Sequence, residues 1–301
     1  MDGLVRVGRK LGSGVRTSVL AAVMAAAGAI VAVPHEVASG QQTAQRPGWL
    51  VRLEQAQPAL LQAEVSRLAP HRKGETDIYA IGIAGWPLDV FHKEVDGGLA
   101  AIGNVLPIKN RTIRLINHPA TDAKIPLATA HNIVAAVHAV GSVMNKQKDV
   151  LVLLLTSHGD RTGFGLRLPD AIVDMKPTDL AGALDREGIK NRVVIISACF
   201  SGIFVPALRS DDTIVMTAAD SQHTSFGCAP ENDWTYFGDA LFRQSMQPGT
   251  DFQHAFAHAR VLIEGWELMD HAKPSNPQGY FGPALVAKLA PFFRSEQASG
   301  R

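Results

Sequence analysis

The chain alternates between short apolar runs and longer mixed segments. The runs are rich in Val, Ile and Leu and have the length of β-strands; they lie at 77–83, 112–117, 150–156, 192–197 and 213–219. Helices are predicted between and after them, most clearly where apolar residues recur three and four positions apart; they lie at 90–106, 128–144, 178–186, 236–244, 252–269 and 283–289. This alternation predicts an α/β fold, with a mostly parallel sheet covered on both faces.

Shorter signals refine this pattern. Segment 164–169 predicts a small hairpin, and the Pro- and Asn-containing segment 274–279 predicts a loop. Thr178 is expected to cap a helix that ends at Gly188.

Two of the apolar runs predict the centre of the sheet. Segments 151–155 and 193–196 contain no polar residue, as expected for strands buried on both faces. The first leads into His158 and the second into Cys199. A right-handed crossover between neighbouring parallel strands brings their carboxyl ends to one edge of the sheet, where open α/β folds place their chemistry.

A thiol and an imidazole at one sheet edge predict a nucleophile and its acid/base partner. Gly159 permits a sharp turn after the histidine, and the backbone N–H groups of Gly159 and Cys199 are candidates for an oxyanion hole. Gly202 leaves space beside the thiol, and a short helix that begins near Ser201 would favour the thiolate. Taken alone, His158 would be a loop histidine and Cys199 an inert thiol; their joint placement favours catalysis.

The remaining candidates for chemistry are weaker. Cys228, the only other cysteine, is expected to be a buried free thiol, since a disulfide would consume the predicted nucleophile. His254 and His258 lie four residues apart on a predicted helix, but the glutamate of the metalloprotease motif is missing between them. A solvated helix face is therefore the favoured interpretation of these two histidines.

Charge and the N-terminal segment suggest where the protein acts. A net charge of +1 gives no electrostatic reason to expect a nucleic-acid partner. Residues 1–40 combine a basic start, an apolar run at 19–33 and small residues at 38–40, the layout of a secretory signal. The run is shorter than the roughly 20 residues of a spanning helix. A cleaved signal peptide and a membrane anchor through 19–33 both stay open, as does a buried Ala-rich helix.

The sequence predicts one catalytic domain behind this leader. Residues 41–75 form a polar, helix-prone entry segment, 76–293 the catalytic domain and 294–301 a polar tail. Either form of leader would place the domain outside the cytoplasm, periplasmic or anchored in the inner membrane.

Three segments, in order, resemble the legumain-like cysteine peptidases of family C13, in the caspase-like clan. They contain Ser157-His158-Gly159, Ala198-Cys199-Phe200-Ser201-Gly202 and the stretch 217–239. Other segments, including Phe91-His92-Lys93-Glu94, resemble the sequences of an exported bacterial branch of that family.

The resemblance implies a caspase-like αβα sandwich and a protein or peptide substrate. It implies no metal and no organic cofactor. It implies that Cys199 attacks the peptide bond to form a thioester and that His158 serves the leaving group. Ser225 and Asp239 match the family's substrate-pocket positions, and Ser197 stands where the family carries an acidic residue. With no arginine evident beside it, Asp239 is expected to be an unpaired carboxylate that selects a polar or basic residue. The alternatives are a peptide ligase or transamidase of the same fold, and a catalytically silent envelope scaffold.

Overall fold

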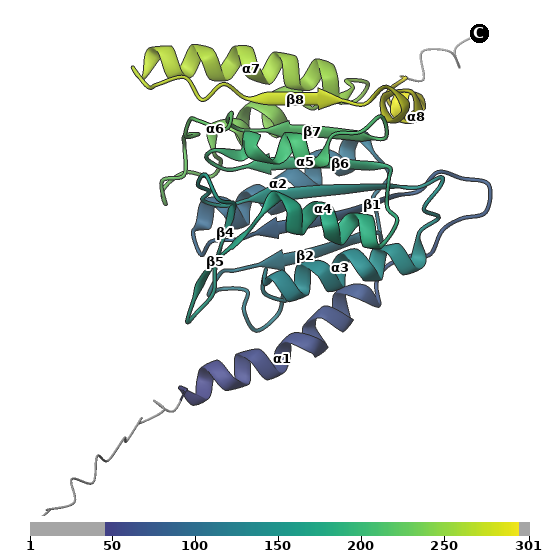
Figure 1. The fold of residues 1–301 in the computed structure, drawn as a ribbon, viewed down its shortest axis with the longest axis vertical. Coiled ribbons are helices and arrows are strands. Elements are labelled where there is room, and N and C mark those ends of the chain that lie inside the picture. Colours follow the sequence, from purple (N-terminus) through teal and green to yellow (C-terminus); the bar gives the residue numbers. More distant parts are fainter. Residues whose placement is uncertain (1–45, 295–301) are drawn as a thin grey trace, which may run out of the picture. The chain divides into compact units, whose positions relative to one another are not determined.

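The computed structural model describes residues 46–294. In this part of the chain, six strands form a sheet in the order β2-β1-β3-β6-β7-β8 (Figure 1). The first five of these are parallel and β8 runs antiparallel to β7. The bounds are β1 (Ile78–Ala84), β2 (Thr112–Ile116), β3 (Val150–Thr156), β6 (Arg192–Ser197), β7 (Thr213–Thr217) and β8 (Gln278–Phe281). A separate antiparallel hairpin consists of β4 (Phe164–Arg167) and β5 (Ile172–Met175).

Helices cover both faces of the sheet, which confirms the predicted αβα sandwich (Figure 1). One face is covered by α2 (Asp89–Val105), α6 (Tyr236–Gly238), the π-helical segment η2 (Asp239–Ser245), α7 (Phe252–Met269) and α8 (Pro283–Phe293). The other face is covered by α1 (Gly48–Val65), α3 (Ala130–Val143), α4 (Pro177–Arg186), the 3₁₀ helix η1 (Ser201–Phe204) and α5 (Val205–Leu208).

The two cores arise from the alternation of side chains along each strand. In β3, Val152 and Leu154 face the α2 side, while Leu151, Leu153 and Leu155 face the α3 side, and all five are completely buried. A strand buried on both faces needs apolar residues at every position, which is why these runs lack the polar alternation of a half-exposed strand.

The structure corrects several predicted boundaries. Helix α4 begins at Pro177, so Thr178 lies inside the helix and does not cap it. The helix predicted at 236–244 is split between α6 and η2. Part of the predicted loop 274–279 belongs to β8, because residues 278–281 pair with β7 through backbone groups that any sequence can supply.

The entry helix α1 packs directly on the sandwich. Leu61 and Val65 contact the core on the α3 side, and the Glu64 carboxylate accepts a hydrogen bond from the Arg114 N–H of β2 at 3.1 Å. No helix within 46–294 is long and apolar enough to cross a membrane. The predicted leader 1–40 and its apolar run 19–33 lie outside the described residues, as does most of the tail 294–301.

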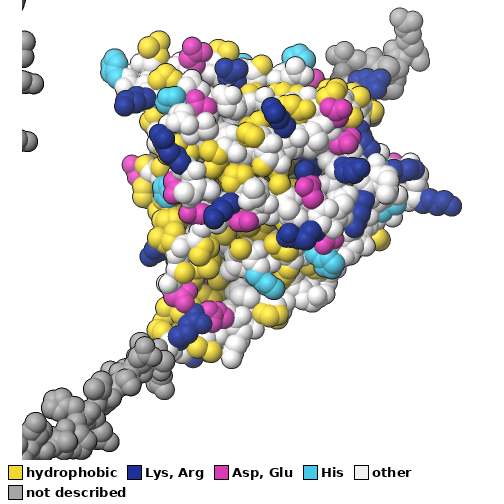
Figure 2. All heavy atoms as spheres, in the orientation of Figure 1, with side chains coloured by type: hydrophobic (Ala, Val, Ile, Leu, Met, Phe, Trp, Pro, Cys, Tyr) yellow, Lys and Arg dark blue, Asp and Glu magenta, His cyan; other side chains and the backbone are white. Residues whose placement is uncertain are grey.

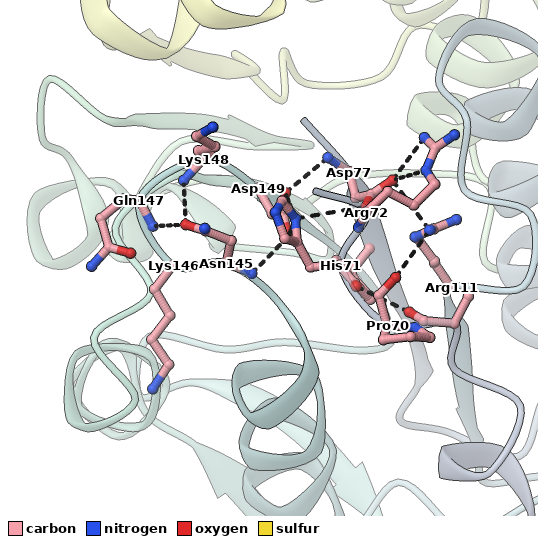
Figure 3. A network of polar contacts seen from close by, with 12 residues as sticks. Pro70, His71, Arg72, Asp77, Arg111, Asn145, Lys146, Gln147, Lys148 and Asp149 are labelled. Atoms are coloured by element: carbon pink, nitrogen blue, oxygen red, sulfur yellow. Dashed lines mark hydrogen bonds and ion pairs between the residues drawn. The ribbon is translucent and has the colours of Figure 1, made fainter. Parts of the chain in front are cut away.

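A cluster of polar side chains lies at the amino ends of the strands, called here the amino edge of the sheet (Figure 3). Asp149 accepts the Asp77 N–H at 2.8 Å and faces the His71 ring at 3.0 Å, while Arg72 and Arg111 pair with Asp77. Both carboxylates are completely buried. The cluster therefore fastens the segment before β1 to the starts of β1 and β3.

Charges of both signs are mixed on the face shown in Figure 2. The same view shows apolar side chains gathered where α1 and the β4–β5 hairpin lie. Trp49, Pro87 and Pro169 are among the residues that line a cavity of about 330 Å³ in this region.

Candidate active site

The predicted pair lies at the carboxyl ends of two neighbouring strands. Thr156 at the end of β3 pairs with Ser197 at the end of β6, and the Ser157 N–H donates to the Ser197 carbonyl at 3.1 Å. His158 and Cys199 each follow two residues later. The parallel register thus brings them to one edge of the sheet, as the sequence predicts.

Gly159 and Cys199 are in direct backbone contact. A Cβ added to Gly159 would lie 2.5 Å from the Cys199 carbonyl oxygen and 3.1 Å from the Ala198 side chain. The hairpin braces this loop, because the Gly165 N–H donates to the His158 carbonyl at 3.0 Å. Only glycine fits at position 159 without displacing the cysteine.

The Cys199 thiol is half-buried and lies against Ser225. The Ser225 N–H donates to Sγ at 3.3 Å, and the Ser225 hydroxyl oxygen lies 3.7 Å from Sγ. Phe200 adopts a left-handed conformation with a φ of 55°, which is strained for a bulky residue. Its N–H donates to the His223 carbonyl at 2.9 Å, and this bond helps to hold the sharp turn that exposes the thiol.

The His158 ring is held by aromatic side chains. Trp86 and Phe91 meet it edge-on, with ring centroids 4.9 and 5.2 Å away. Burial lowers the pKa of His158 below its ordinary value, so the ring is neutral at pH 7. Within residues 46–294 no group hydrogen-bonds to either ring nitrogen, the Cys199 thiol included.

The two proposed oxyanion donors are available. Gly159 and Phe164 face each other as the non-hydrogen-bonded pair of a short antiparallel bridge, so the Gly159 N–H points away from the hairpin. No acceptor for this N–H or for the Cys199 N–H occurs in the described part of the chain. Both groups are free to bind a substrate oxygen.

The three predicted pocket residues have different surroundings. Ser225 contacts the thiol, whereas Ser197 is buried and its hydroxyl lies 3.0 Å from that of Thr235. Asp239 lies on η2, in a cavity of about 500 Å³ whose other lining residues include Trp234, Tyr236, Arg243 and Trp266.

The prediction that Asp239 is an unpaired carboxylate is wrong. Arg243, one turn along η2, donates to it from Nε at 2.6 Å and from a terminal nitrogen at 2.8 Å. Gln244 donates a further hydrogen bond at 3.1 Å. The arginine lies four residues after the aspartate, so the sequence already contained this pairing.

Cys228 is free, as predicted, but it is half-buried and not fully enclosed. Burial and, to a lesser extent, the neighbouring Cys199 raise the pKa of its thiol, which favours the protonated form at pH 7. His254 and His258 point to separate partners, Asp251 and Ser245. They do not form a shared metal site.

Sequence reasoning missed an Asp–His pair beside the nucleophile. The Asp220 carboxylate lies 2.8 Å from His223 Nδ1, and the Asn276 amide donates to Asp220 at 3.1 Å. The three-residue spacing of Asp220 and His223 was the available signal. The aromatic residues Trp86 and Phe91 gave no comparable signal, because an aromatic residue near a strand end is usually part of the core.

The fold is a caspase-like αβα sandwich, and the edge that carries His158 and Cys199 has the residue types of a thiol hydrolase. The comparison with known families is more specific: the model of the peptidase C13 family matches residues 128–285, more than half of the chain. The chain belongs to this family. No curated protein matches it.

Proposed function

We propose that the protein is a cysteine endopeptidase in which Cys199 is the nucleophile and His158 the acid/base. Family membership supports a peptidase in general. The observation that carries the finer proposal is the contact of Gly159 with the Cys199 backbone, which keeps the imidazole, the thiol and two free N–H groups at one edge.

In the proposed mechanism, neutral His158 accepts the thiol proton as Sγ attacks the scissile carbonyl. The Gly159 and Cys199 N–H groups stabilise the oxyanion, and such a donor is typically worth about 2.7–4 kcal/mol. The Ser225 N–H at 3.3 Å stabilises negative charge on sulfur. His158 then donates its proton to the leaving amine, and water hydrolyses the thioester with His158 as base.

The residue before the cleaved bond is proposed to be polar. The Asp239–Arg243 pair offers an acceptor and donors, and a neutral polar side chain can bind both. The preference for a basic residue, which assumed an unpaired carboxylate, no longer has support. Cleavage of a peptide library by wild type and Asp239→Asn tests this: selection among polar residues should weaken, while the turnover of the best substrate falls less.

Cysteine substitutions test the mechanism. We expect Cys199→Ala to abolish peptide cleavage and labelling by an electrophilic peptide probe, and Cys228→Ala to retain both. His158→Ala should reduce turnover about 10²–10⁴-fold, the usual contribution of a general acid/base. Cleavage by Cys199→Ala at the wild-type rate would falsify the assignment of the nucleophile. Adding a peptide amine to the assay distinguishes hydrolysis from ligation, since a ligase would yield the aminolysis product.

A further inference from the structure

Helix α2 contacts both the His158 side chain and the strand that precedes it. Phe91 meets the His158 ring, and Glu94 and Gly98 lie three and seven residues further along, on the same buried face. A Cβ on Gly98 would lie 2.6 Å from Leu154, so the helix packs closely on β3. This packing directs Glu94 toward the carboxyl ends of the strands.

The Glu94 side chain is completely buried between the two strand ends and the segment before α6. Its Oε2 accepts the Thr235 N–H at 2.9 Å, and the Thr235 hydroxyl lies 3.0 Å from that of Ser197. Gly238 lies so close that a Cβ there would collide with the carboxyl group. Residues from α2, β6 and α6 thus meet at one acidic side chain.

No positively charged side chain in residues 46–294 forms an ion pair with Glu94. Its Oε1 is buried without a hydrogen-bond partner within residues 46–294, and the same holds for the Thr156 hydroxyl. An ionised carboxylate in such a place would cost several kcal/mol. Burial raises the pKa of Glu94, and the neighbouring polar groups of Ser197, Thr235 and Thr156 reduce the shift without reversing it. When Oε1 carries the proton, its O–H group can donate a hydrogen bond to the Thr156 hydroxyl oxygen.

We propose that Glu94 is a positioning residue, which acts as a neutral carboxylic acid and joins the end of β3 at Thr156 to the end of β6 at Ser197, through Thr235. Thr156 and Ser197 are register partners, and each lies two residues before a proposed catalytic side chain. Glu94 therefore helps to hold the loops that carry His158 and Cys199 in the positions that the strand register gives them. This inference rests on the proposed function, which requires those two side chains to be in register.

The test measures the alkylation rate of Cys199 by iodoacetamide against pH, in full-length protein carrying Cys228→Ala. This rate reports the neighbourhood of the thiol and needs no substrate. Glu94→Gln preserves a neutral donor and acceptor, so its rate and pH dependence should stay within about twofold of the parent. In Glu94→Ala, the alkylation rate of Cys199 should no longer follow the protonation of His158. It should also be roughly tenfold to a hundredfold lower, since small misplacements of reacting groups have effects of this size.

Glu64→Ala is the matched control. Glu64 is also a buried glutamate that accepts a backbone N–H from a neighbouring element, but it lies on α1 against β2. Its removal should reduce thermal stability without changing the alkylation profile.

Two outcomes would overturn the proposal: Glu94→Gln as impaired as Glu94→Ala, or Glu94→Ala as reactive as Glu64→Ala. If Glu94→Ala does not fold, infrared spectroscopy decides. The wild-type spectrum at pH 7 should contain the carbonyl band of a protonated carboxylic acid that Glu94→Gln lacks, and absence of this difference refutes the neutral form. Failure of the proposed function would give a different result. In that case neither wild type nor any variant would cleave a peptide, but the alkylation rates of the Glu94 variants would still differ as described.

Discussion

His158 is oriented by the edges of two aromatic rings, and no carboxylate in the described part of the chain holds it. Because burial lowers its pKa, we expect the acid limb of kcat/KM below the ordinary imidazole value of about 6.5. Trp86→Ala admits water to the ring and should move this limb upward. The exposed Trp49→Ala is the control and should leave it in place. A limb that does not move in Trp86→Ala would contradict the role given to the aromatic rings.

The residues that the sequence could and could not predict differ in the range of their interactions. His158 and Cys199 were accessible because each directly follows an apolar strand, and strand ends meet at one edge in any parallel sheet. The contact of Glu94 with Thr235 joins residues 141 positions apart, and no local pattern encodes such a pair. The ion pair of Asp239 and Arg243 could have been predicted from the sequence, since residues of opposite charge four positions apart on one helix commonly pair.

At the level of elements, the loop after β3 depends on a single glycine. Gly159→Ala should push its Cβ into the Cys199 carbonyl, lower stability by about 1–3 kcal/mol and reduce turnover together with thiol reactivity. Gly265→Ala on α7 is the matched control, because its added Cβ would have no atom within 4 Å apart from those of the adjacent residues and the helix's own backbone. That change should stabilise the protein by about 0.5–1 kcal/mol, through helix propensity, and leave turnover unchanged. Chemical denaturation and a peptide assay measure both effects.

The polar cluster at the amino edge predicts a stability that depends on pH. Burial alone would raise the pKa of Asp77, but hydrogen bonds from Arg72 and the charges of Arg111 and Arg72 outweigh it, and the net pKa is lowered. Its contribution is therefore complete above the unfolded pKa of about 3.9 and is lost as pH falls through the folded value.

Asp77→Asn should reduce the free energy of unfolding by about 3 kcal/mol at pH 7, the scale of a broken buried pair. The deficit should disappear in acid, where wild type is protonated as well. Denaturant melts from pH 2 to pH 8 measure it. Asp233→Asn, which removes an exposed surface pair with Lys93, should change the free energy of unfolding little at any pH. A deficit for Asp77→Asn that persists in acid would mean that charge is not its cause.

The secondary-structure elements that the sequence does not predict are those that form only through contacts with other elements. The central strands can be predicted from their apolar composition alone. The helix predicted at 252–269 has the bounds of α7. Strand β8 contains Gly279 and no uninterrupted apolar run, and only its pairing with β7 makes it a strand. The π-helical segment η2 packs against α7 and α2, and no local propensity in the sequence indicates a π-helix there.

At the scale of the whole molecule, one prediction concerns the compartment in which the protein works. We expect export, from the basic start and apolar run of the leader. A reporter active only after export, fused behind residue 45, should give a signal, and the same fusion with residues 19–33 deleted should not. A mature terminus near Gln41 would indicate a cleaved signal peptide, and an intact Met1 a membrane anchor. A reporter active only in the cytoplasm would exclude both.

The contact between Gly159 and Cys199 also bears on how related genes can be sorted. A copy under selection for activity must keep a glycine after its histidine, because any side chain there would displace the cysteine. A duplicate retained only as a scaffold is released from that constraint, and it can acquire a side chain at this position while its histidine and cysteine persist by chance. The identity of this one residue therefore offers a genomic marker that separates working enzymes from decayed copies before any protein is made.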